Sequence, residues 1–276
     1  DFQGKNPDIQ NATDSYVGAQ ASISADAGDS GDGGKVIVWA DQTTRYFGHI
    51  SATGGARSGD GGDVEVSGKQ NLLFDGTVDA SAANGARGTL LLDPENLEIT
   101  AGSTVGNGTV DTDNPFDDAQ DPGGADSYVT EDTLEALGAA LDLVLSANDD
   151  ILFDAAIVSL DFAADTGSVT FTAGGSIDVD SVAITTQGGD LTFNAGTGGE
   201  DKTADFGAID LSGGTLTFDN KADQKSGAGV IAGTTSVVKT GLGELKYRNA
   251  NTYSGSTTIS GGTLKADIAD GLQNSE

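Results

Sequence analysis

The chain has 276 residues, of which 43 are acidic and 13 are basic, so its formal net charge is −30. This charge argues against nucleic acid and anionic membrane surfaces as partners, because both are negatively charged themselves. The absence of cysteine excludes disulfides and thiolate metal sites.

Glycine is abundant, with 42 residues, whereas proline occurs 4 times and 36% of the residues are hydrophobic. This composition suits a thin core better than a broad globular one, and the length suits one or two compact domains. No apolar run approaches the roughly 18 residues of a membrane span, and no signal peptide is recognisable. Because the sequence lacks Met and begins at Asp1, we expect a processed product or a piece of a longer chain.

The first part of the chain predicts the stacked coils of a β-solenoid. Residues 1–32 are polar and include one predicted strand. In residues 33–99 short apolar runs recur at near-constant spacing: Val64 follows Val36 by 28 positions, and Leu90 follows Val64 by 26. Strands about one coil apart, with no helix between them, are typical of a solenoid. Hairpins would use the same Gly, Asn and Asp turns, so an antiparallel β-sandwich is the alternative.

Alternation within each predicted strand assigns its two faces. Val64 and Val66 share one face, while Asp63 and Glu65 share the other. We expect the apolar face to point inward and to stack on the equivalent residues of neighbouring coils.

The middle of the chain interrupts this pattern. Residues 101–130 lose the periodicity and contain two of the four prolines, so we expect a long surface loop that leaves the solenoid wall. A helix is predicted at 131–141, with Thr130 as its N-terminal cap and acidic residues in its first turn. We expect its apolar stripe to face inward on the flank of the solenoid; the stripe comprises Leu134, Leu137 and Leu141.

Strands return from residue 149 and are predicted to continue to the end of the chain. A Gly-Gly-x-Leu-Thr-Phe motif occurs at 188–193 and again at 213–218, 25 positions later. Its opening recurs at 261–264 after a further 48 positions, close to two coils. The other predicted strands of this part include 151–153, 169–171 and 177–179.

Two segments of the first part also resemble a known family. They are GGKVIVWADQTTRYFGHISATGGARSGDGGDVEVSG at 33–68 and GTLLLDPENLEI at 88–99. They resemble the haemagglutinin-repeat exoproteins of two-partner secretion, which are filamentous haemagglutinin-like adhesins of Gram-negative bacteria. The resemblance extends upstream through residues 1–5 and 16–18 and downstream to about residue 157. It implies a right-handed parallel β-helix that is exported unfolded through an outer-membrane barrel partner.

A second resemblance covers about residues 229–266. The order of elements is Lys-Thr-Gly-Leu-Gly at 239–243, Tyr-Ser-Gly-Ser-Thr at 253–257 and Gly-Thr-Leu at 262–264. This order resembles the autotransporter-associated β-strand repeat, which is common in passenger domains of secreted surface proteins. Both resemblances imply the same architecture and the same extracellular compartment.

A carbohydrate-active β-helix enzyme is the alternative function, because polysaccharide lyases and glycosidases on this fold use paired acids. The candidate pairs are Asp117 with Asp118, Asp149 with Asp150, and Asp178 with Asp180. With 43 acidic residues, such pairs arise by chance, and basic partners are scarce between residues 100 and 200. The single histidine, His49, has no nucleophile motif beside it, so we expect a structural imidazole and no catalysis.

Calcium is the one cofactor that the sequence leaves open. Gly59-Asp60-Gly61-Gly62-Asp63 resembles one loop of a calcium-binding nonapeptide repeat, but no tandem copy follows it. A Gly-Asp turn between strands explains the same residues. The acidic loop at 111–126 is a second candidate for a hard cation. The candidate ligands are therefore Asp60, Asp63, Asp111, Asp113, Asp117 and Asp118.

Together these observations predict an all-β protein, a right-handed parallel β-helix with one short flanking α-helix. We expect haemagglutinin-type coils at 1–100, a loop and helix at 101–148, and further coils at 149–276 that end in the autotransporter-associated repeat. The predicted function is a structural or adhesive segment of a fibre that is secreted to the cell surface or extracellular matrix of a Gram-negative bacterium. Host or matrix glycans are candidate partners.

End-to-end self-association is also predicted. Terminal coils of a solenoid expose unpaired backbone groups, and the sequence shows no amphipathic capping helix at either end. Such head-to-tail contacts are heterologous and would form open filaments.

Overall fold

The computed structural model describes residues 2–102, 127–137, 141–162, 167–179, 182–196, 206–221, 224–225 and 229–268. The chain divides into two compact units, Asp1–Asp142 and Leu143–Glu276. The predicted division at residues 100 and 148 remains a prediction.

The first unit is built almost entirely from short strands. Its elements are η1 (Phe2–Gly4), β1 (Ala12–Val17), β2 (Ser22–Ser24), β3 (Lys35–Tyr46), β4 (His49–Ser51), β5 (Asp63–Gly68), β6 (Asn71–Phe74), β7 (Thr77–Asp79), β8 (Thr89–Leu92), β9 (Leu97–Thr100), β10 (Tyr128–Thr130) and α1 (Glu131–Leu137).

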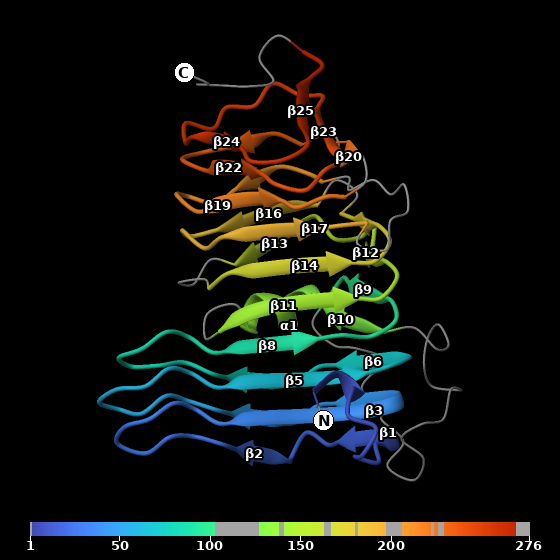
Figure 1. Ribbon diagram of the computed structural model, residues 1–276, viewed down its shortest axis with the longest axis vertical. Coiled ribbons are helices and arrows are strands. Elements are labelled where there is room, and N and C mark those ends of the chain that lie inside the picture. The colour runs from blue at the N-terminus through green and yellow to red at the C-terminus, as the bar shows by residue number, and fades with distance from the viewer. Residues whose placement is uncertain are drawn as a thin grey trace. The chain divides into compact units, whose positions relative to one another are not determined.

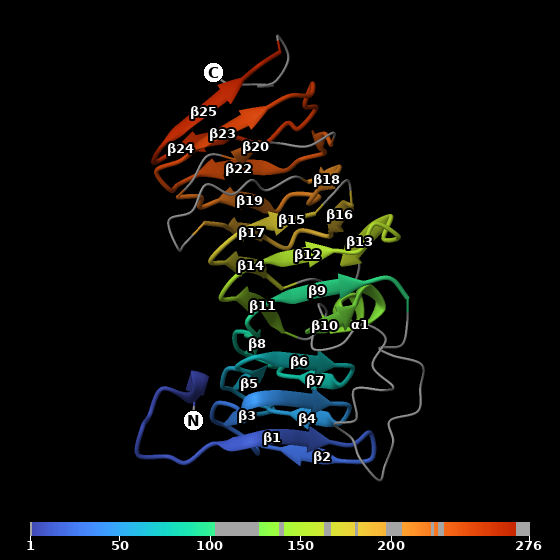
Figure 2. The same ribbon diagram turned by 90° about the vertical axis from the view of Figure 1, so that its right-hand side faces the viewer.

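Three parallel ladders form the walls of this unit. One joins β3, β5 and β8 (Figure 1), a second joins β1, β3, β6, β10 and β9, and a third joins β2, β4 and β7 (Figure 2). In the first ladder Val36 lies opposite Val64, and Val64 lies opposite Leu90. All three side chains are buried. The predicted stacking of these residues one coil apart is therefore confirmed.

The end of the predicted surface loop belongs to the wall instead. Tyr128–Thr130 forms β10, which pairs with both β6 and β9. Val129 is fully buried there, opposite Phe74 and Ile99. The loop prediction is therefore wrong for these three residues, because a single buried valine between two strands gives no periodicity to recognise. Residues 103–126 of that prediction lie outside the described part of the chain.

Helix α1 follows β10 directly and is shorter than the predicted 131–141. The hydroxyl of Thr130 accepts the backbone N–H of Thr133 at 3.2 Å, which is the predicted N-terminal cap. Leu134 and Leu137 are buried, and α1 packs against β7 and β10. The predicted short helix with an inward apolar stripe is confirmed over 131–137.

The second unit continues with further short strands. They are β11 (Asp142–Ala147), β12 (Ile151–Phe153), β13 (Ser159–Phe162), β14 (Val169–Ala173), β15 (Ile177–Asp178), β16 (Ala183–Thr186), β17 (Leu191–Asn194), β18 (Ile209–Asp210), β19 (Thr215–Phe218), β20 (Gln224–Lys225), β21 (Ile231–Ala232), β22 (Ser236–Lys239), β23 (Glu244–Tyr247), β24 (Thr257–Ile259) and β25 (Thr263–Ala266).

Parallel ladders again form the walls of this unit. The longest stacks β11, β14, β17, β19, β22 and β24 (Figure 1). Others join β13, β16, β18 and β21, then β12 and β15, then β20, β23 and β25. Successive partners lie one coil apart in the sequence, as Leu191 and Leu216 do on β17 and β19. The fold is thus the predicted all-β, right-handed parallel β-helix.

An aromatic stack fills the interior of the second unit. Phe171, Phe193 and Phe218 occupy equivalent positions on β14, β17 and β19, with ring centroids 5.6 and 5.8 Å apart. Phe153 and Phe206 pack against this stack. Such offset pairs add to the free energy gained from burying the rings.

The repeated Gly-Gly-Thr-Leu motif lies on two different walls of the second unit. At 213–216 it leads into β19, whereas at 261–264 it leads into β25, which pairs with β23. The ladder of β19 continues instead to β22 and β24, where Leu216 pairs with Val237 and Val237 with Thr257. These two coils are shorter than the coil from Leu191 to Leu216. Leu264 therefore lies beyond the end of the second coil and belongs to another wall.

Candidate functional site

Asp60 and Asp63, the first predicted calcium ligands, have separate structural partners. Asp60 Oδ1 accepts the backbone N–H of Ala86 at 2.8 Å. Asp63 lies on the solvent face of β5 and forms an ion pair with Lys35 at 3.2 Å. The other predicted ligands, Asp111, Asp113, Asp117 and Asp118, lie outside the described residues. Within the described part, no three His, Cys, Asp or Glu side chains gather in a group that could hold a metal. Calcium binding remains a prediction.

The predicted catalytic candidates in the described residues are exposed or make structural contacts. His49 is exposed on β4, and its Nδ1 lies 2.8 Å from the hydroxyl of Thr77 on the neighbouring β7. Asp150 Oδ1 accepts the backbone N–H of Ser176 at 2.5 Å. Asp178 is exposed at the end of β15, whereas Asp180 lies outside the described residues. The contact of His49 fits a structural imidazole on the outer wall.

Aspartate side chains join successive coils, a role that the sequence analysis did not identify. In each case Oδ1 accepts a backbone N–H about one coil further along the chain. We call these contacts aspartate clasps. They are Asp32 to Asp60 N at 2.8 Å, Asp60 to Ala86 N at 2.8 Å, Asp150 to Ser176 N at 2.5 Å and Asp190 to Thr215 N at 2.7 Å. Each clasp satisfies a backbone N–H in a turn, just before a strand or, for Thr215, at the first residue of a strand.

Asp26 makes the most extensive contact of this kind. Its Oδ1 accepts the hydroxyl of Ser51 at 2.5 Å and both the backbone N–H and the hydroxyl of Thr53, at 2.8 and 2.9 Å. Its Oδ2 accepts the hydroxyl of Ser24 at 2.8 Å. Hydrogen bonds from Ser51 and Thr53 hold the pKa of Asp26 well below its usual range, because they favour the ionised carboxylate.

Lys239 is fully buried in the second unit, at the ladder position next to Phe218. Its Nζ donates to the carbonyl oxygens of Thr240 at 2.6 Å and Gly241 at 2.9 Å. A Cβ on Gly262 would come within 2.9 Å of this ammonium group. Burial lowers the pKa of Lys239, although the charge of Asp219 acts in the opposite direction. Lys239 therefore occupies the ladder position that follows the last ring of the aromatic stack, and its ammonium group binds the carbonyls of the glycine-rich turn at 240–241.

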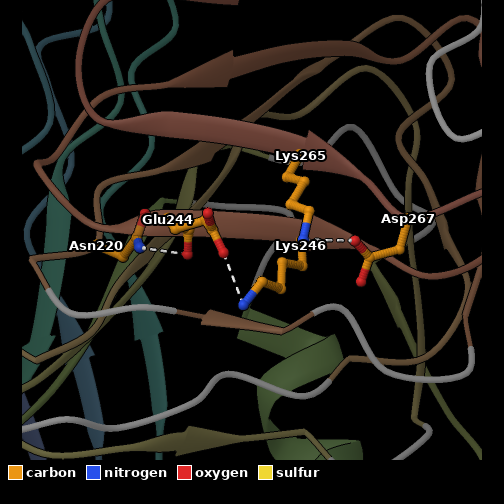
Figure 3. A network of polar contacts seen from close by, with 5 residues as sticks. All are labelled: Asn220, Glu244, Lys246, Lys265 and Asp267. Carbon is orange, nitrogen blue, oxygen red and sulfur yellow. Dashed lines mark hydrogen bonds and ion pairs between the residues drawn. The ribbon is translucent and has the colours of Figure 1, made fainter.

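Two ion pairs lie along the strands beside this turn (Figure 3). Lys246 contacts Glu244 at 2.7 Å on β23, and Lys265 on β25 contacts Asp267 at 3.1 Å. Lys246 and Lys265 are neighbours across the ladder. The side-chain amide of Asn220 also donates to the backbone carbonyl of Glu244 at 3.4 Å. The Lys265–Asp267 pair, with side chains 52% and 37% exposed, contributes at most about 1 kcal/mol of stability.

The same region carries the family similarity. Residues 237–266 match the passenger-associated transport repeat, from β22 through β25. The match includes Lys239, its glycine-rich turn and both lysines of the ion pairs. No curated protein matches the chain. The resemblance of the first part to filamentous haemagglutinin-like exoproteins remains a prediction.

The repeat indicates the compartment in which the protein acts. A passenger repeat on a β-helix is typical of a secreted, surface-located protein, which is the coarse localisation that the sequence predicted. In the described part of the chain, no helix has both the length and the apolar character needed to cross a membrane.

Proposed function

We propose that this chain is a structural and adhesive segment of a secreted bacterial surface or matrix fibre. The observation that carries the proposal is the passenger-type repeat at 237–266, built into the ladders of a parallel β-helix. A solenoid presents a regular outer wall whose residues repeat with each coil, and such surfaces serve binding over an extended length.

Export belongs to the same proposal. We infer passage of the unfolded chain through an outer-membrane partner of a Gram-negative cell, with folding on the outside. The chain suits this route because it contains no cysteine that could form a disulfide before export. Coils that pair mainly with their sequence neighbours can also fold progressively as they emerge.

We further propose that the protein acts without catalysis and associates with further copies into a fibre. Carboxylates at several corners of the coils are engaged in clasps, and this use explains part of the high acid content structurally. Glycans of a host or of the matrix are the proposed adhesive partners.

The test compares adhesion and turnover on the same protein. Beads coated with the folded chain should adhere to polysaccharide-coated surfaces, and beads coated with a Leu216→Asp variant should not, because that variant loses the fold. Electron micrographs of the folded protein should show filaments at high concentration. Release of reducing ends or unsaturated sugars from any of the polysaccharides would contradict the proposal and favour the alternative of a β-helix lyase or glycosidase.

A further inference from the structure

The outer wall of the first unit contains a covered patch where solvated residues were expected. Ile37, Glu65 and Leu91 are neighbours across β3, β5 and β8, on the face opposite the core. Glu65 is only 1% exposed and Leu91 is 8% exposed. Asp63, two residues before Glu65 on the same face, keeps 62% of its side chain exposed. Something therefore covers the wall at Glu65 and leaves Asp63 open.

The cover is the segment Phe2–Lys5, which we call the latch. The backbone N–H of Gln3 donates to both carboxylate oxygens of Glu65, at 3.1 and 3.0 Å. The side-chain amide of Gln3 donates to Asp93 at 2.7 Å. The N–H of Asp93 in turn donates to the hydroxyl of Ser67 at 3.2 Å. The wall thus offers a carboxylate for a backbone N–H and a second carboxylate for an amide side chain.

The patch leaves room only for glycine at position 4 of the latch. Gly4 has a φ of +57°, and a Cβ there would lie 2.6 to 2.7 Å from the indole ring of Trp39. Gln3 has a φ of +54°, in the left-handed region that non-glycine residues rarely adopt. The ring of Phe2 lies 5.2 Å from Nζ of Lys35. Contacts with the wall therefore hold the latch in a backbone conformation that it would not adopt alone.

The latch is connected to β1 by a short exposed tether. Residues 6–10 are all exposed, and the backbone hydrogen bond from the Ile9 N–H to the Asn6 carbonyl is local. Five extended residues reach about 17 Å. The contacts of the latch lie on β3, β5 and the residue after β8, and the tether supplies none of them. A latch from another molecule would meet the same partners, as in domain swapping.

We propose that the patch of Trp39, Glu65, Ser67, Leu91 and Asp93 is a peptide-docking site that accepts the Phe2–Lys5 segment of a second copy, in exchange for the chain's own. This inference goes beyond the fibre proposal and does not depend on adhesion. A short tether gives a segment a millimolar effective concentration at its own site, so exchange needs a protein concentration of that order.

The test removes the chain's own latch from the site by mutation and then adds a synthetic peptide that should bind there. Gln3→Pro removes the donating N–H and restricts the backbone to negative φ, so its latch cannot seat. Trp39 is the only tryptophan, and its emission should shift to the red. A synthetic peptide of residues 2–10, Phe-Gln-Gly-Lys-Asn-Pro-Asp-Ile-Gln, should bind the opened protein and reverse the shift. The same peptide with Ala in place of Gly, or Glu65→Ala in the opened protein, should weaken binding at least about tenfold.

Controls and outcomes separate the possibilities. Ile9→Ala changes only the exposed tether and should leave the Trp39 emission unaltered. Gly4→Ala offers a second way to open the site if Gln3→Pro folds poorly. In sedimentation, the parent protein should form dimers near millimolar concentration, and Gln3→Pro should not. The proposal is overturned if the opened, folded protein ignores the peptide, if opening leaves Trp39 unchanged, or if the parent stays monomeric at that concentration.

Discussion

Individual aspartate side chains accept backbone N–H groups between successive coils of this protein. In a parallel β-helix the strands satisfy their N–H groups along the ladders, while N–H groups at the corners need other acceptors. Asp32, Asp60, Asp150 and Asp190 supply these acceptors to the next coil. A high aspartate content is therefore partly a consequence of the fold, and it need not indicate a cation site.

Replacing Asp26 should reveal the strongest of these contacts. The pKa of Asp26 is lowered in the folded state, so its carboxylate stabilises the fold above the ordinary value of 3.8 and loses this effect as pH falls through the folded-state pKa. We expect Asp26→Asn to lower the free energy of unfolding at pH 7 and to match the parent increasingly below about pH 4. Urea titrations of both proteins across this range measure the difference.

The control for that measurement is Asp8→Asn, which changes an exposed aspartate of the tether. Its stability at pH 7 should equal that of the parent, because the side chain of Asp8 is exposed. A constant difference between Asp26→Asn and the parent from pH 7 to pH 2 would contradict the assigned role.

Glu65 should show the opposite dependence on pH. Burial is the main factor that raises the pKa of Glu65, against the lowering effect of the Gln3 N–H and Ser67, while the charge of Asp93 raises it further. A raised carboxyl pKa means that the folded state binds the proton more tightly, so the parent gains stability as pH falls through that value, which lies above the ordinary 4.5. Relative to Glu65→Gln, the parent should be stabilised by acid between neutral pH and about pH 4.

Unfolding followed by Trp39 emission measures this effect beside the latch. A difference between parent and Glu65→Gln that does not vary with pH would show that Glu65 is solvated in the folded protein.

At the scale of the strand, the inward ladder positions should tolerate no charge. Val64 and Leu216 are 2% and 0% exposed, each between apolar neighbours on the adjacent coils. Val64→Asp and Leu216→Asp bury a carboxylate without a partner, which costs several kcal/mol. We expect loss of the strand signal in circular dichroism at temperatures where the parent is folded.

Thr217→Asp is the matched control, because it places the same side chain on the outward face of the same strand. It should change the free energy of unfolding by less than about 0.5 kcal/mol. Equal damage from Leu216→Asp and Thr217→Asp would mean that the two faces of β19 are not distinguished as the ladder requires.

The aromatic stack gives a second prediction at this scale. Phe193 contacts three other rings, those of Phe171, Phe206 and Phe218. Phe193→Ala should lower the free energy of unfolding by about 3–5 kcal/mol, through lost burial and the remaining cavity. Phe193→Leu should recover much of that loss, since it refills most of the space. Chemical denaturation of the three proteins provides the comparison, and a loss below about 1 kcal/mol would contradict a packed stack.

For the whole molecule, the sequence predicted what depends on period and alternation. Val36, Val64 and Leu90 recur one coil apart with polar residues between them, so both the ladder and its inward face could be predicted. Coil length was less predictable, because the coils shorten after Leu216, whose ladder continues through Val237. The Gly-Gly-Thr-Leu motif at 261–264 lies on another wall as a result.

The covered patch could not be predicted from the same rules. Alternation correctly assigned Glu65 to the outer face, but only the distant segment Phe2–Lys5 makes that position buried. The role of Asp60 could not be predicted either. Its turn resembles a calcium-binding loop, but its Oδ1 accepts the backbone N–H of Ala86 in the next coil. Contacts between residues far apart in sequence leave no local pattern.

The charge of the whole chain should govern its association. At −30, copies repel one another, and salt shortens the range of this repulsion to about 8 Å at 0.15 M ionic strength. We expect light scattering to rise with added salt, and to rise further with divalent cations, which neutralise surface carboxylates more effectively.

If the cations act only as a diffuse atmosphere, Ca²⁺ and Mg²⁺ at matched concentration should have the same effect. Asp60→Asn and Asp63→Asn should not alter it. A response to Ca²⁺ alone that disappears in those two variants would instead establish the predicted calcium site, because a diffuse atmosphere cannot distinguish two single residues among 43 acids.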